Sequence, residues 1–85
     1  PENPAIADTL GWVLLNRGQV ERALPLLETA RRALPDQPDV RYHYASALAK
    51  AGRRAEARQE LADLLNEVEV FAQRTDAQSL LQSLR

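Results

Sequence analysis

The sequence predicts an all-α fold in which two helix-turn-helix repeats are followed by one capping helix. First, the chain matches itself at an offset of 34 residues, placing Pro4 on Pro38 and Gly18 on Gly52. Second, its apolar residues recur at spacings of three and four, as one face of an α-helix requires. Third, Pro and Gly separate the helical segments. We therefore expect residues 1–85 to form a single domain.

The first repeat is expected over about residues 4–37. Its first helix should span 4–17, with Asn3 as N-cap and Pro4 in the first helical position, where its missing N–H is harmless. The second helix should span 20–34. Its apolar stripe consists of Val20, Ala23, Leu24, Leu27, Ala30 and Leu34.

The second repeat is expected over about residues 38–70, with helices over 38–51 and from 54 onward. A capping helix should follow over about 75–84. Thr75 or Asp76 is the expected N-cap, and Leu80, Leu81 and Leu84 lie on one face of that helix. A single amphipathic helix of this kind covers the open end of a stack of repeats.

The glycines have architectural explanations. Gly11 and its counterpart Ala45 fall where the two helices of each repeat should cross, and a minimal side chain allows close approach there. Gly18 and Gly52 should end the first helix of each repeat in a left-handed conformation, which glycine adopts without a Cβ penalty.

This pattern resembles the tetratricopeptide repeat family, whose consensus is W-x2-L-G-x2-Y, then A-x3-F, then P. The first copy meets it at Ala7, Leu10, Gly11, Leu14, Ala23, Leu27 and Pro35. The second meets it at Arg41, Tyr44, Ala45, Leu48, Ala57 and Leu61, with Glu69 in place of the final Pro. The resemblance implies a fragment of a right-handed α-solenoid, whose first helices line a concave, peptide-binding surface.

Composition excludes several classes of function. With 11 Lys+Arg against 12 Asp+Glu, mixed along the same helices, the chain lacks the one-signed face of a nucleic-acid binder. The absence of Cys and the single His exclude thiolate and multi-His metal sites. The acidic residues Asp63, Glu67 and Glu69 are more typical of an exposed helix than of a calcium site, so no metal and no cofactor is expected. No apolar run approaches the roughly 20 residues that span a bilayer, so membrane insertion is not expected.

Catalysis is not expected either. His43 has Asp39 one helical turn before it and Ser46 three residues after it. Such trios are common on helix surfaces by chance, so we assign no catalytic residue and interpret His43 as a groove or surface residue.

The expected partner-binding residues lie on the concave face. They are Asp8, Trp12, Leu15, Tyr42, Ser46 and Ala49. Trp and Tyr often anchor interfaces, although Trp12 could equally fill space against the next helix. Relatives that bind a C-terminal carboxylate use Lys and Asn where this chain has Asp8 and Trp12. We therefore expect an apolar or aromatic partner segment instead.

The sequence thus predicts a protein–protein interaction module, the C-terminal end of a longer array. Its partner would be a protein or peptide segment, or neighbouring repeats of the parent protein. The alternative is a structural segment that caps the array or self-associates, for example as a homodimer. A narrower resemblance, in NPAIADTLGWVLL and ALPLLE, is to the terminal repeats of bacterial exopolysaccharide-export and protein-sorting proteins. It implies a periplasmic or envelope location, which the composition leaves undetermined.

Overall fold

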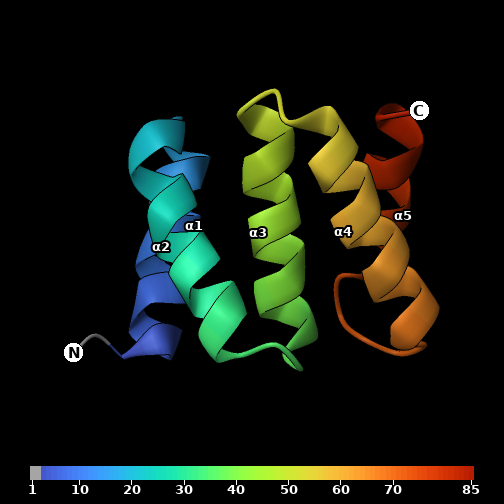
Figure 1. Ribbon diagram of the computed structural model, residues 1–85, viewed down its shortest axis with the longest axis horizontal. Coiled ribbons are helices and arrows are strands. Elements are labelled where there is room, and N and C mark those ends of the chain that lie inside the picture. The colour runs from blue at the N-terminus through green and yellow to red at the C-terminus, as the bar shows by residue number, and fades with distance from the viewer. Residues whose placement is uncertain (1–2) are drawn as a thin grey trace.

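The computed structural model describes residues 3–85 and confirms an all-α fold. Residues 1–2, at the start of the predicted domain, lie outside the described residues. The helices are α1 (Pro4–Asn16), α2 (Val20–Ala33), α3 (Pro38–Lys50), α4 (Arg54–Glu67) and α5 (Arg74–Ser83). Figure 1 shows α3 standing between the α1–α2 pair and the α4–α5 pair. The described part of the chain contains no strand.

The first helix of each repeat ends in the same hydrogen-bonded turn. Gly18 has φ 81° and Gly52 has φ 83°, the left-handed conformation predicted for both. After each glycine the chain turns back. The Gln19 N–H donates to the Leu14 carbonyl and the Arg53 N–H to the Leu48 carbonyl, both at 2.9 Å. This is the Schellman arrangement, which satisfies carbonyls that a helix end leaves free.

Gly11 marks the crossing of α1 and α2. A Cβ at this position would lie 2.7 Å from Leu27 Cγ and 2.8 Å from its Cδ2, closer than atoms pack. Leu27 is fully buried, as is Ala45, the equivalent of Gly11 in the second repeat. The prediction that these positions need minimal side chains is therefore confirmed.

The core combines the predicted stripes of the second helices with buried residues of the first helices. The largest fully buried side chains are Leu15, Leu27, Leu48, Leu61 and Leu64. Tyr44 takes a consensus Leu position and is also buried. Its burial raises its pKa, and the nearby Glu28 carboxylate raises it further.

Arg41 occupies the consensus Trp position of the second repeat and is buried as well. Its Nη1 lies 3.0 Å from Glu67 Oε1, at the end of α4, while its buried Nε has no hydrogen-bond partner. The long aliphatic stem of an arginine can fill apolar space while its head reaches a carboxylate. An arginine thus stands in for the missing aromatic ring.

The capping helix α5 begins earlier than predicted. It starts at Arg74, and Gln73 precedes it without a side-chain capping bond, so the expected cap at Thr75 or Asp76 is wrong. The Arg74 guanidinium instead donates to the Val68 carbonyl at 2.8 Å, satisfying the end of α4. This bond requires Arg74 to lie beside α4, which sequence-based capping preferences do not consider.

Polar contacts hold α5 against α4 at its other end. Arg54 Nη2 and Arg58 Nη1 both donate to the Leu84 carbonyl, at 2.9 and 3.0 Å. Ala77 and Leu84 are buried, while Leu80 and Leu81 are partly buried and pack against the core. The helix therefore closes the C-terminal end of the stack.

Candidate binding groove

A groove of about 480 Å³ runs between α1, α3 and α5. Its lining residues are Trp12, Asn16, Tyr42, Ser46, Ala49, Lys50, Leu80 and Leu84. The repeat architecture creates it, because α1 and α3 are the first helices of successive repeats and lie on the same side of the stack. Four residues predicted for the partner-binding face line this groove: Trp12, Tyr42, Ser46 and Ala49.

The other two predicted residues have different surroundings. Leu15 is 1% exposed and belongs to the core, so it has no surface to offer a partner and its assignment to the binding face is corrected. It points inward because it lies one residue after Leu14 on a helix whose buried face is wide. Asp8 is 6% exposed, and His43 covers its carboxylate.

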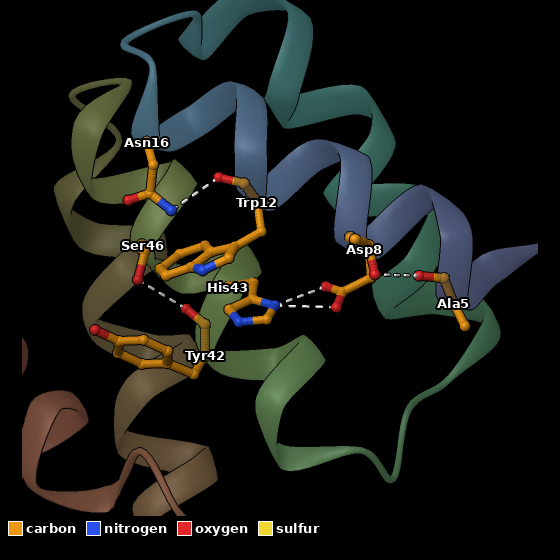
Figure 2. A network of polar contacts seen from close by, with 8 residues as sticks. Ala5, Asp8, Trp12, Asn16, Tyr42, His43 and Ser46 are labelled. Carbon is orange, nitrogen blue, oxygen red and sulfur yellow. Dashed lines mark hydrogen bonds and ion pairs between the residues drawn. The ribbon is translucent and has the colours of Figure 1, made fainter.

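His43 pairs with Asp8 rather than with Asp39. Its Nδ1 lies 2.9 and 3.0 Å from the two Asp8 carboxylate oxygens, linking α3 to α1 (Figure 2). Because an ionised carboxylate can only accept, Nδ1 must carry a hydrogen. The same-helix pairing considered in the sequence is therefore wrong. The repeat period could have suggested the actual partner, since residues about 34 apart lie on adjacent first helices.

Three aromatic rings pack together at this junction. The imidazole of His43 stacks on the indole of Trp12, with centroids 4.1 Å apart and planes 22° from parallel. Tyr42 packs at a tilt, with its centroid 5.9 Å from that of Trp12. Figure 2 shows His43 between the Asp8 carboxylate and the Trp12 ring. The rings of Trp12 and Tyr42 form one wall of the groove.

The polar residues of the groove are partly engaged. Asn16 Nδ2 donates to the Trp12 carbonyl at 3.0 Å, and Ser46 Oγ donates to the Tyr42 carbonyl at 2.9 Å. The hydroxyl of Ser46 is thus bonded within its own helix and not to His43, so the trio suspected in the sequence does not assemble as a nucleophile and base. Lys50 is the charged residue of the lining.

Two kinds of feature are absent from residues 3–85. Within this range no helix has both the length and the apolar character needed to cross a membrane. The same residues contain no cluster of three or more His, Cys, Asp or Glu side chains that could hold a metal ion.

Comparison with known proteins agrees with the repeat architecture. The sequence profile of the family described as "Tetratricopeptide repeat" matches residues 14–84. The chain is 36% identical, over 84 residues, to the Vi polysaccharide export protein VexE of Salmonella typhi. That match covers 96% of this chain but 13% of VexE. No solved structure matches significantly.

The matched profile covers most of the chain, from the last turn of α1 through the capping helix α5. Domains of this kind are non-enzymatic scaffolds that mediate protein–protein interactions. The period of 34 residues, the crossing at Gly11 and the paired Schellman turns fit the same assignment. The chain belongs to the tetratricopeptide repeat family.

Proposed function

We propose that this chain is the C-terminal end of a longer tetratricopeptide array and binds an apolar or aromatic segment of a partner protein in its groove. The observation that carries the proposal is the aromatic wall formed by Trp12 and Tyr42. Both side chains are half-buried, so each ring is held by the protein while part of it faces the groove. Large rigid aromatic side chains of this kind supply much of the binding energy at protein interfaces.

The C-terminal side of the groove supports the same ligand chemistry. Leu80 of α5 is half-buried and adds an apolar surface opposite the rings. The carboxylate of Asp8 is paired with His43, and this pairing removes it from contact with a ligand. An apolar segment can therefore enter without desolvating an unpaired carboxylate.

A second exposed surface supports the position of the chain within an array. On α1, Ile6, Leu10 and Val13 are 66%, 48% and 45% exposed and form an apolar patch. Their equivalents one repeat later on α3 are Val40, Tyr44 and Ala47, at 3%, 8% and 0%. The difference arises because α2 packs beside α3, whereas the described residues include no helix in that place beside α1.

We infer that a preceding repeat covers this α1 patch in the parent protein, as α2 covers α3. Repeat proteins bury each face against a neighbour, and a patch of this kind otherwise favours association. In the isolated chain the same patch favours the alternative of self-association, for which a homodimer is the simplest form. The relative VexE is named for polysaccharide export. We propose a similar role for the parent protein in the envelope of a bacterium.

Selection from a display library of random linear peptides tests groove binding. We expect enriched peptides to carry aromatic or aliphatic residues, and Trp12→Ala or Tyr42→Ala to weaken their binding at least tenfold. Leu10→Ser, on the α1 patch, is the matched control and should leave their affinity unchanged. Peptides that bind both groove variants as well as the parent chain would refute a groove function.

Light scattering over a concentration series shows which surface mediates any self-association of the chain, the α1 patch or the groove. Self-association through that patch should disappear in Leu10→Ser and persist in Trp12→Ala. Association abolished by Trp12→Ala but not by Leu10→Ser would instead show that copies of the chain occupy the groove.

A further inference from the structure

We infer that Asp8 and His43 act as a positioning pair that fixes the indole of Trp12 in the groove wall. Neither residue lines the groove itself, and His43 acts through Trp12. The importance of Trp12 for partner binding rests on the proposed function. The positioning of its ring does not, because it can be measured without any partner.

The Asp8 carboxylate holds the plane of the His43 imidazole. Both Asp8 oxygens lie within 3.0 Å of Nδ1, so the carboxylate holds one edge of the ring. The side chains of His43 and Asp8 are 12% and 9% exposed, which leaves water little access to replace either partner. A buried carboxylate that loses its donor is costly, so this contact strongly favours one orientation of His43.

The imidazole of His43 in turn stacks on the indole of Trp12. The Trp12 indole lies almost parallel to the imidazole, with a centroid separation of 4.1 Å, so the two rings are stacked in close contact. Asp8 precedes Trp12 by four residues on α1, so the two project from the same side of the helix. The carboxylate, the imidazole and the indole therefore form a short chain of contacts, α1 to α3 and back to α1, that closes on itself.

The other named neighbours of Trp12 hold its indole less closely than His43 does. Tyr42 meets Trp12 at a tilt of 56° and a longer separation of 5.9 Å. Asn16 bonds to the Trp12 main-chain carbonyl and not to its indole. Of the aromatic contacts that Trp12 makes among the described residues, the stack on His43 is thus the closest and the most nearly parallel.

Substitutions can separate the hydrogen bond from the stack. His43→Asn keeps a side-chain N–H near the position of Nδ1 but removes the ring. Asp8→Asn keeps an oxygen that accepts from Nδ1, while Asp8→Ala removes the acceptor. Asp39→Ala is the matched control, because it removes a carboxylate one helical turn before His43 on α3 that does not pair with the imidazole.

Time-resolved fluorescence anisotropy of Trp12, the single tryptophan of the chain, reports the order of its ring. Circular dichroism run in parallel checks that each variant is folded. We expect the parent chain and Asp39→Ala to show an indole that tumbles with the whole protein. In His43→Asn and Asp8→Ala, the anisotropy decay of Trp12 should gain a fast local component, and acrylamide should quench its fluorescence severalfold more strongly. Asp8→Asn should retain most of the order that Trp12 has in the parent chain.

Unchanged Trp12 order in folded His43→Asn and Asp8→Ala would overturn the inference. So would equal behaviour of Asp8→Asn and Asp8→Ala, because the hydrogen bond would then have no influence on the ring. If His43→Asn or Asp8→Ala unfolds, the other of these two variants still decides, because unchanged Trp12 order in either folded variant would overturn the inference. Library peptides then measure the consequence, an affinity loss of roughly tenfold in His43→Asn.

Discussion

Replacing Gly11 with Ala sets two opposing effects against each other at the helix crossing. Alanine is the better helix former, which would stabilise α1 by about 0.5–1 kcal/mol. The added Cβ, however, would lie 2.7 Å from Leu27 Cγ and 3.3 Å from Leu26 Cβ. Leu27 is fully buried within the core, so it could move only by displacing its neighbours. Overpacking of this kind costs about 1–3 kcal/mol.

We therefore expect Gly11→Ala to lower the free energy of unfolding by about 1–2 kcal/mol, since the clash outweighs the gain in helix propensity. For a domain of this size, the midpoint of thermal unfolding should fall by about 4–16 °C. Circular dichroism during heating and urea titration measures both quantities. A change in the urea midpoint with an unchanged slope would attribute the loss to the folded state.

The equivalent position in the second repeat provides the comparison. Ala45 is buried with a Cβ already in place, so Ala45→Gly loses helix propensity and leaves a small void. It should destabilise the chain by about 1 kcal/mol. A Gly11→Ala variant as stable as the parent chain would refute the reasoning, because it would show that α1 and α2 are not in the close contact described.

Three further outcomes are expected. Gly18→Ala should lower the free energy of unfolding, measured by urea titration, by about 1–2 kcal/mol, because a side chain with a Cβ is strained in the left-handed conformation. An unchanged free energy of unfolding would contradict the Schellman turn. Replacing both Arg54 and Arg58 with Gln should loosen the packing of α5 on α4, since both side chains donate to the Leu84 carbonyl. Amide hydrogen exchange should then accelerate in α5 more than in α4, and equal exchange protection of the two helices would contradict this contact. Burial raises the pKa of Tyr44 above 10.0, so the unfolded chain releases this proton before the folded chain does, and the free energy of unfolding should fall as the pH rises past about 10. Urea titrations at several pH values should show a smaller fall for Tyr44→Phe. An unchanged pH dependence in that variant would contradict the assignment.

Local sequence signals predicted most of the helix bounds. Asn3 was expected to cap α1, and its side chain accepts from the Ala5 N–H at 2.9 Å. Gly18 and Gly52 marked the ends of α1 and α3 because few other residues tolerate a positive φ. These features depend on residues within one turn of each other, which a sequence displays directly.

Features that depend on tertiary contact were harder to predict. Thr75 or Asp76 was the better cap by preference, yet Gln73 precedes α5 because Arg74 is held by the end of α4. His43 had Asp39 nearby in sequence, but the stacking of repeats brought Asp8 to it. Of the groove residues, Asn16, Lys50, Leu80 and Leu84 were not predicted. The two leucines were missed because they come from α5 and its C-cap, and the position of α5 against α1 and α3 has no local signature.

The proposed binding groove can be tested most directly by NMR titration of the isotope-labelled chain with a library-selected peptide. The account predicts that chemical-shift changes concentrate at the Trp12 indole, Tyr42, Ser46 and α5. It predicts little change at Leu10 and Val13 on the α1 patch. Changes centred on that patch, with Trp12 and Tyr42 unaffected, would contradict the account and make the apolar end of the stack the binding surface.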